Sequence, residues 1–575
     1  MAKRWQLRPP APPALFEKFP EIDRILLQVL HARRLTSQTE IDLFLDPDYS
    51  RDVHDPGLFR DMSKAVERII QAVRQSEKIC IYGDYDADGV CASAVLTETL
   101  TQLGVTPEVY IPFRETEGYG MNIAAVEELA AQGTKLIITV DCGSTNVPEV
   151  ARANALGMDV IITDHHDEPP QLPAAFAIIN PELKAETYPY KHLAASGVAY
   201  KLATALLRAT EYGAGLGREP LPVGWEKWLL DLVATSTVTD MVPMLGENRV
   251  FVRYGLDVLR KGRRVGFNQL FTAMRFEREQ ADEETLGFMI GPRLNAAGRM
   301  NHASTAYRLL VTNDQDEAAK LAGELSAANV ERQRVTEATV AEALRQIGDS
   351  PESMLLSAYG RDWPVGILGL VASRIMEKYQ RPTVVMATSQ GKIVGSGRSI
   401  QAYDITAGLV AVREVLDRFG GHPQACGFTL KPGATPESFT AALGEQAESA
   451  LTGRDLTPVL DIDAEVILDD ISWRLVEDVA RLAPFGMQAP RPRFLSRGVR
   501  VVSVDTVGKD GKHLRLHVSH ATSTVRKTIG FRFGSWVEQL SPGDTVDMVF
   551  EAGVNEWNGH REIELKIVDL DHAQS

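Results

Sequence analysis

The chain has 575 residues, of which 44% are hydrophobic, and a formal net charge of −16. At roughly 100–200 residues per domain, this length predicts three or four domains. No apolar run reaches the length of about 18 residues that a membrane span requires. The four cysteines show no CxxC spacing, which favours buried thiols in a reducing cytoplasm over disulfides or a zinc site. We therefore expect a cytoplasmic protein without a membrane segment.

Residues 1–50 predict a small helical lead-in, after which short β-rich runs alternate with helical patterns. The predicted strands are 78–83, 107–113, 135–140, 159–164 and 176–180. This alternation predicts a parallel sheet with helices on both faces. A mainly helical region follows, and the charged stretch 314–348 predicts one long helix, or two, connecting two domains.

A second α/β unit begins near Ser353, where MLLSAYG, PTVVMAT and KIVGSGRS are the predicted strands. From about residue 459 the pattern becomes all-β. Five apolar runs separated by turns fit a small Greek-key barrel such as an OB-fold, and a sandwich is the alternative.

Three aspartates occupy alternate positions after the first predicted strand, in the sequence DYDADG (Asp84, Asp86 and Asp88). Carboxylates this close disfavour one another's charged form. A calcium-binding EF-hand loop would need a glutamate at position twelve, which is Val95 here, and the motif follows a strand rather than a helix. The calcium-loop interpretation is therefore rejected. Any single aspartate at a strand end is more commonly a helix cap.

Two further predicted strands end in similar residues. The strand 135–140 runs directly into Asp141, and the strand 159–164 runs into His165 and His166. Because ligands collect beyond the carboxyl ends of the strands in an open parallel sheet, we expect the three clusters to meet in one cleft. Aspartates with histidines favour manganese or magnesium over zinc, and a bridging carboxylate holds two ions about 4 Å apart in phosphoryl-transfer sites.

Two basic blocks stand out in this acidic chain. Six Lys or Arg residues face one aspartate between Arg249 and Arg264, and ten face two aspartates between Arg491 and Phe533. Each block is either an electrostatic footprint for a polyanion or ordinary solvated surface charge.

The motifs DYDADG, VDCGS and TDHH resemble, in this order, those of the DHH phosphoesterase family, and TSTVTDMVPMLGENR adds Asp240 as a further acid. The resemblance continues through GPRLNAAGRM, VGILGLVASRI, GSGRSI and FGGHPQACGF to LAPFG and VGKDGKHLRL, so it covers nearly the whole chain. This order is the pattern of the family's single-strand-specific 5′→3′ DNA exonucleases. It implies an N-terminal helical lead-in at 1–50, a catalytic DHH domain with a parallel α/β sheet at 51–310, a connecting helix at 311–350, an α/β substrate-binding domain at 351–455 and an OB-fold at 456–575.

The resemblance also implies two divalent metal ions, Mn²⁺ or Mg²⁺. Asp86 would bind one ion and Asp88 the other, with Asp141 bridging them. Asp84 and His166 are each either a ligand or a supporting residue. Tyr82 stands where some relatives carry a histidine, which makes Asp84 a candidate substitute ligand. The expected catalytic residues are Asp84, Asp86, Asp88, Asp141, His165, His166 and Asp240, and the expected metal ligands are the same set without His166.

Binding of the strand is expected from arginines, which grip a terminal phosphate with two hydrogen bonds, and from a turn at Gly420 and Gly421 that lets the backbone approach phosphate. The expected substrate-binding residues are Arg114, Arg293, Arg299, Ser373, Arg374, Ser396, Arg398, His422, Lys512 and Arg515. Relatives often carry a histidine after the tryptophan at position 363, but Pro364 stands there, so neither residue receives a catalytic role. In the barrel, the aromatic residues that suit base stacking, unless they form its core, are Phe531, Phe533, Trp536 and Trp557.

The resemblance implies metal-dependent degradation of single-stranded DNA from the 5′ end to mononucleotides, in DNA repair and recombination. It further implies a monomer that cooperates with a helicase and the single-strand binding protein. One alternative is a phosphodiesterase for very short RNAs or cyclic dinucleotides, which would have no use for the barrel. The other is a non-catalytic scaffold, which would not need an acid or histidine at every motif.

Overall fold

The structure is a computed structural model that describes residues 3–520, 524–557 and 560–573, and it divides into two compact units. The larger unit comprises His54–Val242 and Tyr254–Thr457. The smaller unit comprises the residues before His54, Pro243–Arg253 and the chain from Pro458 onward.

The first sheet of the larger unit has five strands, all parallel, in the order β3-β2-β4-β5-β6. Their bounds are Lys78–Tyr82 (β2), Glu108–Tyr110 (β3), Thr134–Val140 (β4), Asp159–Thr163 (β5) and Ala177–Ile179 (β6). Each coincides with one of the five predicted strands, so the prediction of a parallel sheet is confirmed.

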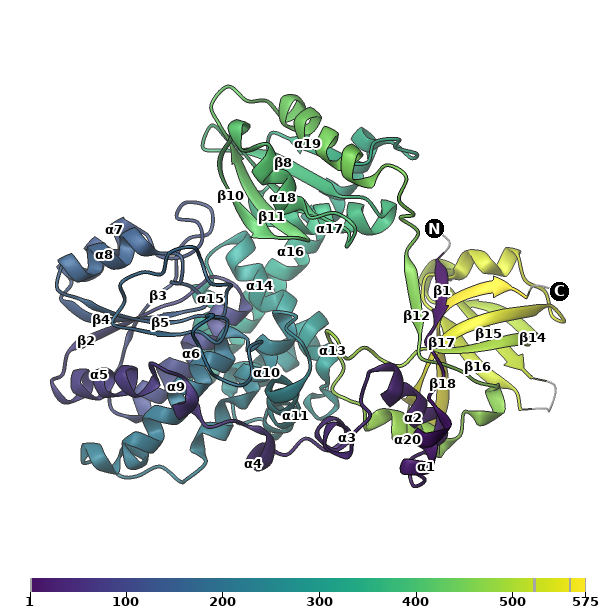
Figure 1. The fold of residues 1–575 in the computed structure, drawn as a ribbon, viewed down its shortest axis with the longest axis horizontal. Coiled ribbons are helices and arrows are strands. Elements are labelled where there is room, and N and C mark those ends of the chain that lie inside the picture. Colours follow the sequence, from purple (N-terminus) through teal and green to yellow (C-terminus); the bar gives the residue numbers. More distant parts are fainter. Residues whose placement is uncertain (1–2, 521–523, 558–559, 574–575) are drawn as a thin grey trace. The chain divides into compact units, whose positions relative to one another are not determined.

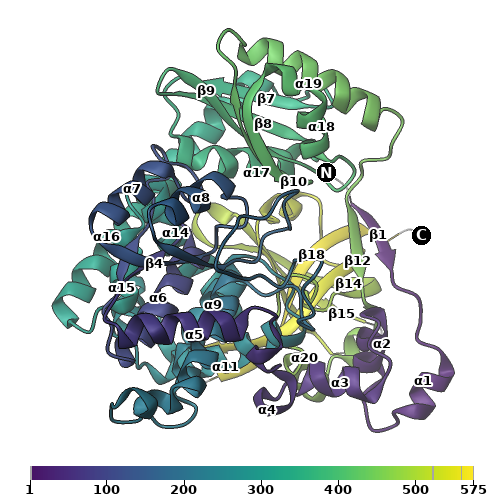
Figure 2. The ribbon, with the colours of Figure 1, turned by 60° about the vertical axis from the view of Figure 1, so that its left-hand side comes forward.

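Both faces of this sheet are covered by helices, because the central strands are apolar on both sides. Cys80 and Ile137 belong to a buried cluster with α7 (Ile123–Ala131) and α8 (Val147–Ala155). The other face carries the helices α5 (Met62–Arg74), α6 (Ala87–Gln102) and α9 (Ala195–Ala209). The two layers of helices are visible in Figure 1, and in the turned view of Figure 2 α7 and α8 still lie opposite α5 and α9.

A helical region follows the sheet and surrounds α6, which contacts α9, α10 and α15. The elements of this region are η3 (Trp225–Leu229), α10 (Leu230–Thr239), α11 (Gly246–Lys261), α12 (Val265–Met274), α13 (Glu283–Thr285), the π-helix η5 (Leu286–Ile290), α14 (Gly291–Met300) and α15 (Ser304–Val311). The predicted connector is one continuous helix, α16 (Gln315–Ile347). The side chain of Asp314 caps it by accepting a hydrogen bond from the Glu317 N–H at 2.8 Å.

The second sheet has the order β10-β11-β9-β8-β7, with only β7 and β8 parallel. Its strands are β7 (Leu356–Gly360), β8 (Thr383–Ser389), β9 (Lys392–Arg398), β10 (Leu416–His422) and β11 (Ala425–Leu430), and its helices are α17 (Leu368–Tyr379), α18 (Ile405–Ala411) and α19 (Pro436–Leu451). The predicted turn at Gly420 and Gly421 is wrong. Both glycines lie in β10, where Gly421 pairs with Cys426, and the turn is at Pro423 and Gln424.

The smaller unit contains the predicted C-terminal barrel. Its strands are β13 (Ala464–Glu465), β14 (Phe494–Val507), β15 (His513–Ser519), β16 (Arg526–Gly530), β17 (Thr545–Trp557) and β18 (His560–His572). The strand β14 pairs with both β15 and β17, so the sheet closes on itself and the sandwich alternative is excluded. Helix α20 (Trp473–Ala480) contacts β17.

The start of the chain belongs to this smaller unit and is less helical than predicted. It opens with strand β1 (Arg4–Leu7), which pairs in parallel with β12 (Val459–Ile462). The helices α1 (Pro13–Lys18), α2 (Arg24–Ala32), α3 (Gln38–Leu45) and α4 (Tyr49–Asp52) follow. Strand β1 has only four residues, and Pro9 and Pro10 follow it closely, so its sequence shows no periodic pattern of hydrophobicity. The strand is therefore specified by its pairing with β12 rather than by local sequence.

The first basic block is not a single surface footprint. Arg249 is 1% exposed, and its guanidinium donates to the backbone carbonyls of Phe44, Leu482 and Pro484. Arg264 is also enclosed, with its Nε donating to Asp231 at 2.9 Å. These two charges stabilise the interior, so the polyanion interpretation is wrong for them.

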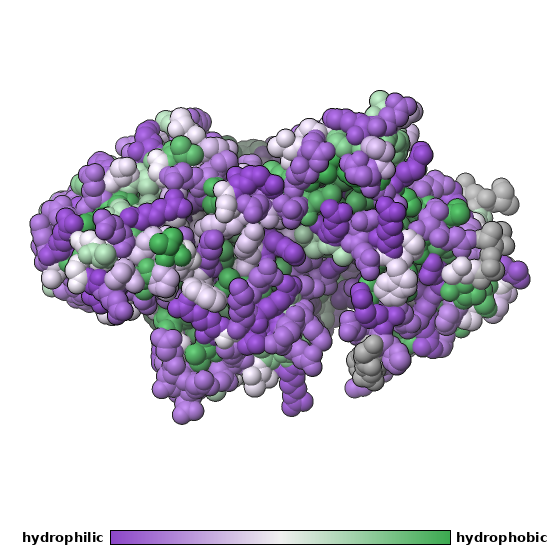
Figure 3. Space-filling model, turned by 90° about the horizontal axis from the view of Figure 1, so that it is seen from below, coloured by the Kyte–Doolittle hydropathy of each residue, from purple (hydrophilic) through white to green (hydrophobic). Residues whose placement is uncertain are grey.

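Apolar side chains form no continuous band on the face shown in Figure 3, where they are scattered among hydrophilic ones. Among the residues that the structure describes, no helix combines the length and apolar character needed to cross a bilayer. All four cysteines are buried and unpaired, as predicted.

Candidate metal centre

The loops that follow β2, β4 and β5 bring acidic and histidine side chains to one edge of the parallel sheet. Asp86 caps α6, its Oδ1 accepting from the Asp88 N–H at 2.8 Å, and Asp88 lies in the first turn of that helix. Asp141 follows β4 and His165 follows β5. Asp240 joins them from the C-terminal end of α10. The expected convergence of the clusters is therefore present in the structure.

The donor atoms form three overlapping groups, each with its atoms within 4.8 Å of one another: Asp84 with Asp86 and Asp141, Asp88 with His165 and Asp240, and Asp141 with His165 and His166. His165 Nε2 lies 3.2 Å from Asp141 Oδ1, 3.7 Å from Asp88 Oδ2 and 3.8 Å from Asp240 Oδ2. Asp141 belongs to two of these groups, one with Asp84 and Asp86 and one with the two histidines, which is the position that a bridging carboxylate occupies.

Asp88, which lies in α6, is fixed by hydrogen bonds from two other helices. Its carboxylate accepts hydrogen bonds from the backbone N–H groups of Ala195 at 2.7 Å and Ser196 at 2.9 Å, at the start of α9. The hydroxyl of Ser236, on α10, donates to the same carboxylate. Sequence reasoning missed both serines: Ser236 lies in TSTVTDMVPMLGENR, where only Asp240 was singled out, and Ser196 lies in none of the quoted motifs.

The backbone at two positions is shaped for this site. A Cβ on Gly89 would lie 2.7 Å from the backbone nitrogen and oxygen of Asp84, so only glycine permits α6 to approach the preceding loop this closely. Asp141 adopts a left-handed backbone with φ +63°, which is uncommon for a residue with a side chain and concentrates at functional sites.

The carboxylates are buried and repel one another. Burial, with the charge of Asp86, raises the pKa of Asp84 well above its ordinary value. Burial, with the charge of Asp88, raises the pKa of Asp141 and raises that of Asp240 to about 7. Burial opposes a charge on His165, but the surrounding carboxylates outweigh it and raise the pKa of the imidazole. Without a cation the site concentrates uncompensated negative charge.

These residues fit a pair of divalent cations. Oδ1 of Asp84 is buried and has no hydrogen-bond partner, although a buried carboxylate oxygen normally has one. Oxygen donors with a single imidazole suit manganese and magnesium. A cation among Asp84, Asp86 and Asp141 would satisfy that oxygen. This favours Asp84 as a ligand over a purely supporting role.

His166 differs from His165 in its surroundings. Its Nδ1 lies 2.8 Å from Asp164 Oδ1 and 3.2 Å from the hydroxyl of Tyr119, which also donates to the Asp141 carbonyl at 2.9 Å. Burial of Asp164 is outweighed by its hydrogen bonds and by the charge of His166, which lower the pKa of the carboxyl. Asp164 and Tyr119 therefore orient the imidazole. Tyr119 was missed because its loop carries no motif.

A group of arginines lies beside the metal centre. Burial and the neighbouring charges of Arg114, Arg332 and Arg398 lower the pKa of Arg299 to about 9. Arg114 stacks 4.8 Å from the ring centre of Tyr85, which follows Asp84. The structure thus brings together Arg114, Arg299 and Arg398, which lie far apart in sequence, and none of them forms an ion pair with a carboxylate of the described residues.

A second arginine group adjoins the first. Burial and the charges of Arg374 and Arg293 lower the pKa of Arg332, on α16. The Nε atoms of Arg293 and Arg332 are buried without a hydrogen-bond partner. Arg332 was missed in the sequence, because nothing local distinguishes it from Arg334 in the same charged helix.

The other expected substrate-binding residues differ from one another in their contacts. Ser396 accepts from Arg398 at 3.2 Å, whereas the Ser373 hydroxyl donates to a helix carbonyl. His422 is exposed, 3.7 Å from Asp167. On the barrel, Arg515 pairs with Asp505 and Lys512 lies 3.6 Å from Asp510.

Three of the four barrel aromatics expected to stack on bases, Phe531, Phe533 and Trp536, are not fully buried. Phe531 is 54% exposed, and the ring of Trp536 lies 5.7 Å from that of His572. Phe533 is partly buried. The side chain of Trp557 lies outside the described residues.

Trp363 and Pro364 received no catalytic role, and Trp363 makes structural contacts. The Trp363 indole is buried against α16 and α17, and its N–H donates to Glu342 at 3.1 Å.

Models of known protein families match three separate parts of the chain. The model described as the DHH family, N-terminal domain, matches residues 78–237, the DHHA1 domain matches 352–451, and the RecJ OB domain matches 462–569. The single-stranded-DNA-specific exonuclease RecJ of Bacillus subtilis (strain 168) is 36% identical over 574 residues, covering 98% of this chain and 70% of the relative. The Escherichia coli (strain K12) protein of the same name is 32% identical, covering 88% and 90%.

Solved structures agree with the sequence relatives. The crystal structure of RecJ in complex with Mn²⁺ from Thermus thermophilus superposes with a TM-score of 0.84 at 28% identity, covering 100% of this chain and 80% of that one. The Mg²⁺ complex from the same organism gives a TM-score of 0.77 at 26% identity, covering 100% and 79%. A shared order of domains, extensive identity and a shared fold lead to one conclusion: the chain belongs to the RecJ family of DHH proteins.

Proposed function

We propose that this protein is a metal-dependent exonuclease that degrades single-stranded DNA from the 5′ end to mononucleotides. The observation that carries the proposal is the shared position of Asp141 between two groups of acidic and imidazole donors, with uncompensated arginines beside them. Its relatives in the RecJ family bear the name single-stranded-DNA-specific exonuclease, and the related crystal structures are Mn²⁺ and Mg²⁺ complexes.

The donor groups would hold the cations and the arginines would hold the strand. Asp88, Asp141, His165 and Asp240 would hold one ion, and Asp84, Asp86 and Asp141 the other. When bound, divalent cations in such a pair polarise the phosphate and lower the pKa of water. Arg114, Arg299 and Arg398 bind and orient the phosphate next to this centre.

Recognition of the 5′ end is assigned to the arginines. A terminal phosphate carries more negative charge than an internal one, and its free oxygens accept paired hydrogen bonds from guanidinium groups. Burial without a carboxylate partner leaves Arg299 and Arg332 short of an anion. We therefore place the 5′ end at these residues, with the first phosphodiester at the metal centre.

Cellular partners rest on the family resemblance alone. We propose a cytoplasmic monomer that acts on single-stranded DNA in repair and recombination, together with a helicase and the single-strand binding protein. The exposed Phe531 and the basic strands of the barrel support contact with a longer strand, since stacking on aromatic rings is tolerant of sequence.

The first experiment is digestion of 5′-phosphorylated, 5′-hydroxyl and 3′-labelled oligonucleotides with Mn²⁺, Mg²⁺ or EDTA. We expect mononucleotides released from the 5′ end, only with metal, and no activity from Asp141→Ala. Release from the 3′ end, or unaltered turnover by Asp141→Ala, would sink the assignment.

The second experiment tests end recognition with a matched pair on one helix. Arg332→Ala removes an arginine of the group, whereas Arg334→Ala removes an exposed one paired with Glu331. A charge-assisted hydrogen bond contributes about 1.5–3 kcal/mol, so KM for 5′-phosphorylated substrate should rise roughly 10- to 100-fold for Arg332→Ala only. Equal KM values for the two variants would contradict this role.

A further inference from the structure

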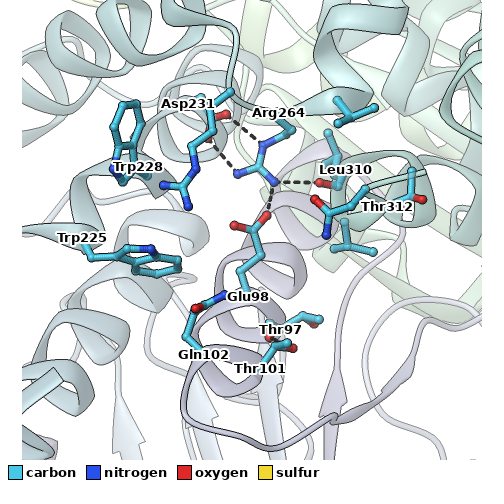
Figure 4. A pocket seen from close by; sticks show the side chains of 14 residues that line it. Thr97, Glu98, Thr101, Gln102, Trp225, Trp228, Asp231, Arg264, Leu310 and Thr312 are labelled. Atoms are coloured by element: carbon cyan, nitrogen blue, oxygen red, sulfur yellow. Dashed lines mark hydrogen bonds and ion pairs between the residues drawn. The ribbon is translucent and has the colours of Figure 1, made fainter. Parts of the chain in front are cut away.

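A second pocket lies in the DHH part of the chain, at the far end of α6 from the metal centre. Its volume is about 160 Å³, and Figure 4 shows the residues of α6, η3, α10 and α15 that line it. Asp88 near one end of α6 and Glu98 near the other are ten residues apart, which corresponds to about 15 Å along the helix. The residues that matter for its chemistry are Gln102, Trp225, Trp228, Arg263 and Asn313.

The pocket combines aromatic faces with unneutralised positive charge. The Arg263 guanidinium lies 4.9 Å from the ring centre of Trp228 and 5.6 Å from that of Trp225. Lys261 does not line the pocket, but its ammonium lies 5.6 Å from the ring centre of Trp228, which does. Neither cation has a carboxylate of the described residues within ion-pair distance, whereas the neighbouring Arg264 has two. Both are therefore available to an external anion.

The repulsion of such an anion by the acids of the pocket is reduced, because both acids pair with Arg264. Arg264 donates to Asp231 at 2.9 Å and to the Leu310 carbonyl at 2.7 Å, and it also pairs with Glu98. Figure 4 shows this network forming one wall, with Trp225 and Trp228 on the other side of the opening. Arg264 thus offsets one of the two carboxylate charges, and Arg263 and Lys261 leave these five groups with one net positive charge.

The remaining polar groups suit a heterocyclic base. The side-chain amides of Gln102 and Asn313 line the pocket, and each carries a donor and an acceptor that match the edge of a base. Indole faces stack on bases without regard to sequence. At about 30 Å³ per water the volume corresponds to roughly five water molecules, which admits a base and leaves sugar and phosphate at the mouth.

We propose that this pocket binds a nucleotide, with its base against Trp225 and Trp228 and its phosphate at Arg263 and Lys261. Two sources share this chemistry: a free mononucleotide and a nucleotide within a strand. The choice of sources rests on the proposed function, since an exonuclease releases mononucleotides and binds strands. The site itself rests on the pocket's own residues.

The test uses the full chain carrying Asp141→Ala, in EDTA, so that nuclease activity plays no part. Equilibrium dialysis measures binding of labelled deoxynucleoside monophosphates and, separately, of a short oligodeoxynucleotide. In that background Arg263→Ala and Trp228→Ala should each remove the pocket's binding component, with about tenfold or greater loss of affinity. Trp228→Phe keeps a ring and should retain most of it. The control is Arg345→Ala, which removes an exposed arginine on α16.

Binding of mononucleotides that depends on Arg263 and Trp228 supports the proposal with a free nucleotide as ligand. Binding of the oligonucleotide alone, with the same dependence, supports it with a strand as the source. Absence of both, or binding that is unchanged in Arg263→Ala and Trp228→Ala, overturns it. Unfolding curves matched to the parent protein ensure that a lost component reflects the site. A negative result leaves the nuclease untouched, because that activity is measured on the unsubstituted chain with metal.

Discussion

Replacing Asp84 by asparagine should stabilise the metal-free protein and weaken its response to metal. Asp84 is 4% exposed, one of its oxygens has no partner, and its neighbours Asp86 and Asp141 carry like charge. A buried polar group without a partner costs about 1–3 kcal/mol, and more when charged. The asparagine keeps the shape and removes the charge, so we expect a gain of about 1–3 kcal/mol in EDTA.

With metal the order should reverse. A ligand at 100 times its Kd stabilises the folded state by about 2.7 kcal/mol, and Asp84→Asn removes one charged donor from the group that holds the ion. The assay is denaturant unfolding of both proteins, first in EDTA and then over a series of Mn²⁺ concentrations. Lower stability of Asp84→Asn than of the parent in EDTA would refute the reasoning, because it would mean that the fold already compensates this carboxylate without a cation.

The burial of the acids also predicts an unusual pH dependence. The pKa of Asp240 in the folded protein is raised to about 7 from an ordinary value near 4. The metal-free protein should therefore lose stability as pH rises from about 4 to 7, and saturating Mn²⁺ should abolish this loss. A stability that does not change with pH in EDTA would contradict the prediction. Arg264→Leu leaves the buried Asp231 without its partner and should lower the free energy of unfolding by about 3–5 kcal/mol, measured by chemical unfolding. The double variant Arg264→Leu/Asp231→Leu should recover much of this loss. Additive effects of the two changes would argue against a coupled pair. Gly89→Ala should abolish Mn²⁺ binding in calorimetry, because the added Cβ would lie 2.7 Å from backbone atoms. The control is Gly323→Ala, whose Cβ would have nothing within 4 Å. This control should stabilise α16 by about 0.5–1 kcal/mol and bind Mn²⁺ normally.

The parallel sheet was predictable because its strands are buried on both faces and therefore read as continuous apolar runs. The first three acidic clusters were predictable for a related reason. The carboxyl ends of parallel strands share one edge, so the position of a residue in its strand specifies its place in space. Asp240 follows a helix, and only the family resemblance placed it in the site.

What the sequence could not supply are contacts that depend on tertiary packing. Arg249 and Arg264 look like surface charge in a basic block, yet carbonyls and carboxylates from distant segments enclose them. Arg332 could not be singled out for a different reason. In the sequence it looks like one charge among many on a helix, whereas in the structure its charged neighbours are other arginines. Gly420 and Gly421 suggested a turn, but pairing with β11 extends the strand through them.

The way Asp88 is held has a consequence for how the enzyme comes into being on the ribosome. Its partners Ala195, Ser196 and Ser236 lie more than a hundred residues further along the chain, and Asp240 completes the same donor group. A nascent chain that already displays DYDADG and the two histidines still lacks the groups that orient Asp88. Contacts of such long sequence separation form late in folding, because loop closure must be completed first. The cutting centre therefore matures only after α10 has emerged and docked, so a truncated translation product carries the signature motifs without an assembled nuclease.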